Sequence, residues 1–273
     1  MTDRYAVFGN PVNHSQSPWI HTRFAEQTGQ DLEYSRVEVP LDGFAAAVQR
    51  FFQQGGRGLN ITVPFKQEAW ALCQQRSARA ETAGAVNTLL LREDGALFGD
   101  NTDGIGLLRD LQNTLELEPA GKRLLILGAG GAVRGVLEPL LDTGPATLVI
   151  ANRTVAKAEA LAEAFGPPVI ACGFDALADQ QFDLLINATS SGLQGEMPRL
   201  PDGLMAPGAA AYDMVYGPEP TPFIRWAEQQ GASRVCDGLG MLVEQAAESF
   251  RLWRGMAPET GAVIRDLRAR LQA

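Results

Sequence analysis

The 273-residue sequence is poor in the residues that build disulfide frameworks and metal sites. It contains three cysteines, Cys73, Cys172 and Cys236, which are odd in number and widely spaced, and two histidines, His14 and His21. This spacing excludes a disulfide framework and gives no cluster of metal ligands. We therefore predict that the protein has no metal site and that it works in a reducing compartment.

Basic residues and long apolar runs are also scarce. Lys and Arg number 23 against 32 Asp and Glu, a formal net charge of −9, which disfavours binding to nucleic acid or to an anionic membrane. The longest run without a charged residue, 5–22, holds two Pro, two Asn and two His, which does not suit a membrane span. The opening residues Met-Thr-Asp-Arg-Tyr show no export signal, so we expect a cytoplasmic protein, either a monomer or a homodimer.

What the sequence does contain is an alternation of short apolar runs with amphipathic stretches. This pattern indicates βα units and an α/β fold with two domains. We expect an N-terminal α/β domain at 1–101, a Rossmann-type doubly wound domain at 102–237, and C-terminal helices at 238–273 that return to the first domain. Within the first domain, Ser17 is predicted to cap a helix at 18–28 and Asp42 to cap a helix at 42–54.

A glycine-rich turn follows the apolar run 123–127. Gly128 allows a tight turn there, and Gly130 lets the backbone approach a pyrophosphate at the start of the next helix. Val133 occupies the place of the third glycine of the dinucleotide fingerprint, so an ordinary βα turn is the alternative.

The end of the next predicted strand indicates which dinucleotide would bind. NAD-binding domains usually carry an acidic residue there, whereas this chain has Asn152-Arg153-Thr154, with Lys157 one turn later. Arg can bind a 2′-phosphate with paired, charge-assisted hydrogen bonds, so the pattern favours NADP over NAD. Thr189, after the run 184–187, suits the same crevice, although a plain turn explains it equally well.

Four polar clusters stand at predicted strand ends in the first domain, at 15–18, 60–66, 85–88 and 99–104. Each has an ordinary structural explanation. Ser17 suits a helix cap, Lys66 suits a solvated surface, and Asp103 suits the first turn of its helix.

Together these motifs resemble one family, the shikimate dehydrogenases, over nearly the whole chain. The matching segments in the first half are 9–21, 58–66, 84–88 and 99–104, and those in the second half are 128–132, 152–154, 213–216 and 237–245. The resemblance implies reversible, NADP-linked reduction of 3-dehydroshikimate to shikimate, a step toward chorismate and the aromatic amino acids. It also implies that 1–101 binds the substrate and 102–237 binds NADP.

Position by position, the resemblance assigns catalysis, as proton transfer, to Lys66 and Asp103. The residues that match the family's substrate-binding positions are Ser15, Ser17, Thr62, Asn87 and Gln245, with Tyr216 close by. Asn60, which stands just before Thr62 in the same motif, is a lower-ranked substrate-binding candidate. The cofactor-binding residues are Gly128, Ala129, Gly130, Gly131, Ala132, Asn152, Arg153, Thr154, Lys157, Thr189, Met214 and Gly238. Ser77 stands where relatives often carry an acidic residue, so it is not included.

The chemistry of these residue types suits the reaction. A lysine beside a carboxylate can donate a hydrogen bond to the carbonyl oxygen and deliver a proton as that oxygen becomes an alkoxide. Three alternatives remain: a quinate/shikimate dehydrogenase that prefers NAD, a non-catalytic sensor of shikimate-like ligands, and another NADP enzyme such as a folate dehydrogenase. The segment 152–154 disfavours the first, Lys66 with Asp103 disfavours the second, and the polar clusters disfavour the third.

Overall fold

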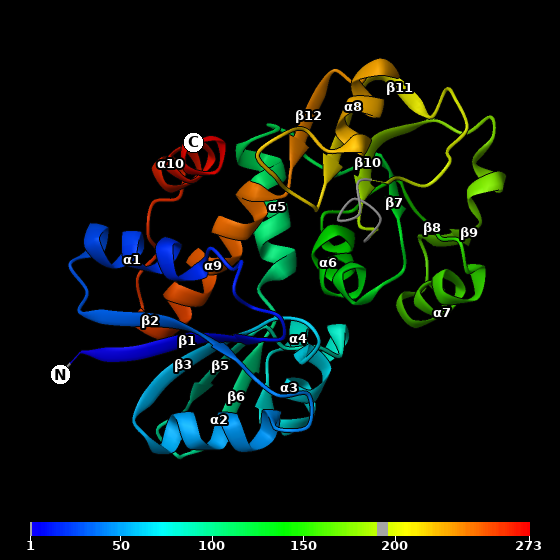
Figure 1. Ribbon diagram of the computed structural model, residues 1–273. Coiled ribbons are helices and arrows are strands. Elements are labelled where there is room, and N and C mark those ends of the chain that lie inside the picture. Colours follow the sequence, from blue (N-terminus) through cyan, green and yellow to red (C-terminus); the bar gives the residue numbers. More distant parts are fainter. Residues whose placement is uncertain (1, 190–195) are drawn as a thin grey trace. The chain divides into compact units, whose positions relative to one another are not determined.

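The computed structural model describes residues 2–189 and 196–273 of the chain (Figure 1). The chain forms two compact units. Unit 1 consists of Met1–Gly106 and Val243–Leu267, and unit 2 of Leu107–Leu242 and Arg268–Ala273. Each unit contains a six-stranded sheet of its own.

The sheet of unit 1 has the strand order β2-β1-β3-β5-β6-β4, in which only β5 pairs antiparallel to its neighbours. The strands are β1 (Asp3–Gly9), β2 (Leu32–Glu38), β3 (Gly56–Ile61), β4 (Gln75–Arg76), β5 (Thr88–Leu91) and β6 (Leu97–Asp100). Because β5 runs in reverse, its first residue lies at the same edge as the last residues of β1, β3 and β6. That edge therefore gathers the four polar clusters of the sequence.

The helices of unit 1 correct two sequence predictions. The helices are α1 (Ser17–Thr28), α2 (Phe44–Gln53), α3 (Lys66–Leu72) and α4 (Ala78–Ala83). Ser17 is not the N-cap of α1, because the helix already begins at Ser17 and Gln16 holds the cap position. Asp42 is not the cap of α2, since a turn closed by Gly43 N–H and Pro40 O, 3.0 Å, places Gly43 at the cap.

The sheet of unit 2 is parallel throughout, in the order β12-β11-β10-β7-β8-β9. Its strands are β7 (Arg123–Leu127), β8 (Thr147–Ala151), β9 (Val169–Cys172), β10 (Phe182–Asn187), β11 (Met205–Asp213) and β12 (Arg234–Asp237), with helices α6 (Gly131–Asp142), α7 (Val155–Phe165), η1 (Phe174–Leu177) and α8 (Pro222–Gln229). Counted from β9, the order is 3-2-1-4-5-6 in sequence terms, which is that of the dinucleotide-binding fold. The predicted doubly wound α/β architecture is confirmed.

The core of unit 2 explains why β7 does not alternate between apolar and polar residues. Leu124 and Ile126 of β7 pack into the apolar cluster on one face of the sheet, and Leu125 and Leu127 pack into the cluster on the other face. All four are fully buried. A strand covered on both faces must be apolar at every position.

Three helices have residues in both units: α5 (Asp103–Asn113), α9 (Leu239–Arg254) and α10 (Gly261–Gln272). The first four residues of α5 and the part of α9 from Val243 onward belong to unit 1. No helix in the described part of the chain is long and apolar enough to span a membrane.

Candidate active site

The polar edge of unit 1 contains an ion pair between Lys66 and Asp103. Lys66 is the first residue of α3 and Asp103 the first residue of α5. Lys66 Nζ lies 2.5 Å from Asp103 Oδ2, and the two side chains are 28% and 12% exposed. Asp103 is thus mostly withdrawn from solvent, whereas the Lys66 side chain stays partly exposed.

The second oxygen of Asp103 is bound as well. Asn87 Nδ2, which lies just before β5, donates to Asp103 Oδ1 at 2.8 Å. The backbone N–H of Asp103 donates to Asn101 Oδ1 at 3.1 Å, and Asn101 Nδ2 donates to Ala85 O at 3.1 Å. These contacts fix both the carboxylate and the turn that carries it.

Gln245 of α9 joins the same group of side chains. Asn87 Nδ2 lies 3.3 Å from Gln245 Oε1 and donates to Thr102 Oγ1 at 2.9 Å, while Thr102 N–H donates to Asn87 Oδ1 at 2.9 Å. Four of the predicted residues, Lys66, Asp103, Asn87 and Gln245, are therefore linked by contacts. They come from segments that are far apart in the sequence.

Asn60 contacts this group through Asn87, and its side-chain amide is hydrogen-bonded inside the protein. Its Oδ1 accepts from Tyr34 OH at 2.7 Å. Its Nδ2 lies within hydrogen-bonding distance of Asn87 O, Thr88 Oγ1 and Ser249 Oγ, at 3.1, 3.2 and 3.0 Å. The residue is only 6% exposed, so its contacts support the site from within.

Ser15, Ser17 and Thr62 lie at the same sheet edge, in the segments that follow β1 and β3. Ser15 Oγ donates to Ser17 Oγ at 3.1 Å and accepts from Ser17 N–H at 3.3 Å. The segment after β3 is tied to β1 by a hydrogen bond from Thr62 N–H to Phe8 O, 2.9 Å. Their hydroxyl groups thus lie in the segments that follow two adjacent strands of one sheet.

The glycine turn of unit 2 leaves space at the start of α6. Gly128 has φ +110°, and a Cβ there would lie 3.1 Å from Ala188 O. A Cβ at Gly130 or Gly131 would meet nothing within 4 Å, and the N-cap Gly130 has no side chain to bond the first N–H groups. The turn therefore presents open backbone donors and a helix N-terminus, which suit a pyrophosphate. Ala129 and Ala132 belong to the same turn.

The end of β8 carries the predicted 2′-phosphate residues. Arg153, Thr154 and Lys157 are exposed around the start of α7, and Thr154 holds its N-cap position without a side-chain cap bond. Asn152 Nδ2 donates to Thr154 O at 2.9 Å, which shapes the turn. No carboxylate stands at this strand end between 151 and 158, where NAD-binding domains place one.

Two buried side chains hold the turns after β10 and β11. Asn187 Oδ1 accepts from Thr189 N–H and Oγ1, at 3.2 and 2.8 Å, and its Nδ2 donates to Asp213 Oδ1 at 3.0 Å. Asp213 also accepts from Val215 N–H at 3.0 Å and from Thr221 Oγ1 at 2.5 Å. Burial raises the pKa of Asp213. Thr189 and the turn after Asp213 are thus held by one network.

Met214 and Tyr216 lie on the turn after β11. A Cβ at Gly238 would lie 2.3 Å from Met214 O, so this position requires glycine. Burial raises the pKa of the Tyr216 phenol, which stays protonated and able to donate a hydrogen bond at neutral pH. Tyr216 belongs to unit 2, unlike the other predicted substrate-binding residues.

Sequence reasoning missed several supporting residues. Thr102 and Ser249 bond the side chains of Asn87 and Asn60 directly, and Asn187 and Asp213 organise the turns of unit 2. Thr102 lies in the matching segment 99–104, so its polar side chain is a signal that sequence can supply. Ser249 had a weaker signal, since it lies one helical turn after Gln245 on α9.

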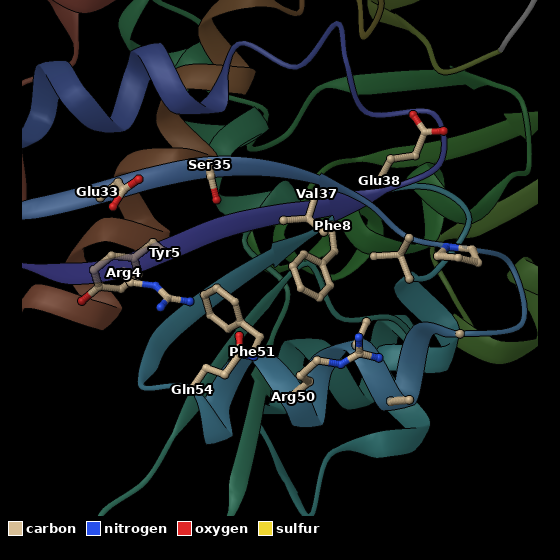
Figure 2. Close-up of a pocket in the computed structure, with 15 residues that line it drawn as sticks. Arg4, Tyr5, Phe8, Glu33, Ser35, Val37, Glu38, Arg50, Phe51 and Gln54 are labelled. Carbon is tan, nitrogen blue, oxygen red and sulfur yellow. The ribbon is translucent and has the colours of Figure 1, made fainter.

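A cavity of about 440 Å³ lies elsewhere in unit 1, between α2 and the strands β1 and β2 (Figure 2). Its walls include Phe8, Val37 and Phe51, and none of the predicted site residues lines it. The charged side chains around it, Arg4, Glu33, Glu38 and Arg50, are exposed and solvated. Its lining therefore indicates no particular ligand.

Comparison with known proteins agrees with the geometry. A family model for the shikimate dehydrogenase substrate binding domain matches residues 7–89, one for shikimate / quinate 5-dehydrogenase matches 111–194, and one for the shikimate 5'-dehydrogenase C-terminal domain matches 238–268.

Single proteins match over nearly the full length. The shikimate dehydrogenase (NADP(+)) of Alkalilimnicola ehrlichii is 62% identical over 270 residues, 98% of this chain and 99% of that protein. The crystal structure of an Ael1 enzyme from Pseudomonas putida has a TM-score of 0.92 at 49% identity and covers 97% of this chain and 98% of that one. Shikimate 5-dehydrogenase from Thermus thermophilus, solved with NADP(H) and shikimate, has a TM-score of 0.88 at 36% identity, covering 99% and 100%. The chain belongs to the shikimate dehydrogenase family.

Proposed function

We propose that this protein is an NADP-dependent oxidoreductase that reversibly reduces 3-dehydroshikimate to shikimate, in the biosynthesis of chorismate and the aromatic amino acids. Family membership and the names of the full-length relatives support this activity and its cofactor. The observation that carries the proposal is the 2.5 Å contact between the Lys66 ammonium and the Asp103 carboxylate, at the polar edge of unit 1.

Lys66 and Asp103 are proposed to move the proton of the reaction. One N–H of the ammonium points to Asp103, which leaves further donors for a substrate oxygen. During reduction, Lys66 would donate a hydrogen bond to the carbonyl oxygen and deliver a proton as that oxygen becomes an alkoxide. During oxidation, the same pair would take the hydroxyl proton. Asp103 keeps the amine in place because its other oxygen is bonded to Asn87.

The remaining polar side chains of unit 1 are proposed to bind the hydroxyl groups and the carboxylate of the ring. Gln245, Asn87 and Thr62 suit the hydroxyl groups, and the Ser15 and Ser17 hydroxyls suit the carboxylate. On unit 2, the protonated Tyr216 phenol is proposed as a further hydrogen-bond donor to the substrate. The internal hydrogen bonds of Asn60 support a role in holding Asn87 and helix α9, rather than in direct contact with the substrate.

The residues of unit 2 fit NADP. The open space over Gly130 and Gly131 would take the pyrophosphate at the N-terminus of α6. Arg153 and Thr154 would hold the 2′-phosphate, and Asn152 and Lys157 lie beside them. The segments of Thr189, Met214 and Gly238 would line the nicotinamide end. When bound, the cofactor supplies the hydride for the carbonyl carbon.

The division of roles is part of the proposal. Residues 1–101 would bind the substrate, residues 102–237 would bind NADP, and the helices at 238–273 would pack back on the substrate domain. The match of 7–89 to a substrate binding domain supports the first of these roles. We place the protein in the cytoplasm, as a monomer or homodimer.

Nicotinamide absorbance tests the proposal directly. The purified protein is assayed with shikimate and with quinate, each in the presence of NADP and of NAD. Rapid turnover with shikimate and NADP alone is the expected result. Comparable turnover with quinate or NAD would assign a broader specificity. Ligand binding without any turnover would refute the proposed enzymatic activity and favour a non-catalytic sensor.

A further inference from the structure

A second group of charged side chains lies beside the proposed active site, and the mechanism above does not use it. Arg79 of α4 forms a bidentate pair with Asp100, the last residue of β6. Arg79 Nε donates to Asp100 Oδ1 at 2.7 Å, and Arg79 Nη2 donates to Asp100 Oδ2 at 2.6 Å. The same Nη2 lies 3.1 Å from Oε1 of Glu248 on α9. One guanidinium therefore joins two acidic groups that are far apart in the chain.

Both acidic side chains are buried. Asp100 and Glu248 are each 3% exposed at the side chain, and Arg79 is 22% exposed. Burial makes a charge partner important for both carboxylates, because a desolvated charge without one is costly, and Arg79 is the guanidinium that the two share. Glu248 has a second partner, Arg251, whose Nε and Nη2 donate at 2.9 and 2.7 Å. Asp100 also accepts from Ser77 Oγ at 2.5 Å and from Asn101 N–H at 2.7 Å.

Asp100 is connected to the catalytic pair through one short turn. Its Oδ1 accepts the N–H of Asn101, and Asn101 Oδ1 accepts the N–H of Asp103. The orientation of the Asp100 carboxylate thus sets the start of the turn whose end places Asp103 against Lys66. A bidentate guanidinium fixes that orientation more tightly than a single charge can.

Glu248 is connected to the other side of the site. It lies three residues after Gln245 on α9, so the two side chains share one side of the helix. The next residue, Ser249, lies 2.8 Å from Thr88 Oγ1 and 3.0 Å from Asn60 Nδ2. Holding Glu248 therefore holds the part of α9 that brings Gln245 to Asn87.

We propose that Arg79 is a positioning residue: its single guanidinium locks the Asp103 turn and the Gln245 helix into one geometry. It contacts neither substrate nor cofactor and acts through Asp100 and Glu248. This inference rests on the proposed function, since the geometry that Arg79 holds is the one assigned there to proton transfer.

The test compares Arg79→Lys with Arg251→Lys by steady-state kinetics of shikimate oxidation. Lysine keeps the charge but cannot form the fork to Asp100 while reaching Glu248. We expect Arg79→Lys to lower kcat roughly 10- to 100-fold, because small displacements of catalytic groups have effects of that size. The KM for NADP should stay unchanged. Arg251→Lys is the matched control: it alters the same Glu248 carboxylate but does not touch Asp100, and kcat should remain that of the wild type.

A double-mutant cycle with Asp100→Asn separates positioning from simple loss of stability. If Arg79 acts through Asp100, the double variant should lose little more kcat than either single variant, since both remove the same fork. The pH profile of kcat should also shift in Arg79→Lys and not in Arg251→Lys, because the Lys66–Asp103 contact changes only in the former.

Three results would overturn the inference. The first is a wild-type kcat and pH profile in Arg79→Lys, even with a lowered melting temperature. The second is an equal loss of kcat in Arg251→Lys, and the third is fully additive losses in the double variant. A wild-type protein inactive with shikimate and NADP would instead refute the proposed function, so the two failures are distinguishable.

Discussion

Lys66 is the residue on which the proposed chemistry depends most directly. Its side chain is partly exposed, and its partner Asp103 is bonded through both oxygens. We expect Lys66→Ala to lower kcat about 10²- to 10⁴-fold with little change in the KM for shikimate, as removal of a general acid should. Steady-state kinetics in both directions measure this. A raised KM with an unchanged kcat would make Lys66 a binding residue only.

His21 is buried in unit 1 and serves packing. Its ring stacks on Tyr34 with centroids 4.3 Å apart and an interplanar angle of 5°, and burial lowers its pKa to about 3. In the unfolded chain the pKa is about 6.5, so between these values the unfolded state binds the extra proton. Stability from this group is therefore complete above about pH 6.5 and falls as the pH drops through that window.

The variant His21→Phe keeps the ring and removes the titration. Between about pH 7.5 and pH 5, the wild type should lose roughly 2 kcal/mol more of its free energy of unfolding than the variant. Urea titrations at both pH values measure the difference. All other titrating groups are common to the two proteins, so equal losses would show that His21 is not held neutral.

The close approach of Gly238 to the backbone of Met214 fixes the point at which α9 begins. Gly238 precedes α9, and a Cβ there would lie 2.3 Å from the backbone oxygen of Met214. Because backbone cannot move aside as a side chain can, Gly238→Ala should displace the Met214 turn. We expect a higher KM for NADP and a lower melting temperature.

The matched control is Gly261→Ala, at the first residue of α10. The added Cβ there has only an ordinary contact with Arg265 Nη1 at 3.6 Å, so the variant should resemble the wild type in both measurements. Wild-type NADP kinetics in Gly238→Ala would show that the Met214 turn does not contribute to cofactor binding.

The elements that sequence predicted well are those with a strong local pattern. The apolar run at 123–127 and the glycines after it predict a buried strand and a tight turn, and both exist. The N-caps predicted at Ser17 and Asp42 are wrong. Ser17 is already the first residue of α1, and the turn that ends at Gly43 places the start of α2 after Asp42.

Long-range contacts set the limit of sequence reasoning at the site. The family resemblance predicts Lys66 and Asp103 as a pair, and the structure places them in contact. Arg79 and Glu248 gave no such signal, because 169 residues separate them and their contact exists only after α9 packs in unit 1. The same holds for Ser249, whose partners Asn60 and Thr88 belong to β3 and β5.

The assignment of two ligands to two units predicts independent stabilisation. Each ligand alone should add about 2.7 kcal/mol to the free energy of unfolding at a concentration 100 times its Kd, and should therefore raise the melting temperature. Arg153→Ala should lose most of the shift caused by NADP and keep the shift caused by shikimate. Differential scanning fluorimetry with each ligand separately measures both. Loss of the shikimate shift in that variant would contradict the assignment.

The discontinuous make-up of unit 1 has a consequence for synthesis on the ribosome. Unit 2 is nearly continuous, from Leu107 to Leu242, whereas unit 1 needs Val243–Leu267 as well as the first part of the chain. Until Ser249 emerges, Asn60 Nδ2 and Thr88 Oγ1 lack one of their buried partners. The unit that starts first therefore stays unfinished until near the end of synthesis, and a nascent chain that stalls before α9 would carry all six strands of the unit 2 sheet beside an unfinished unit 1.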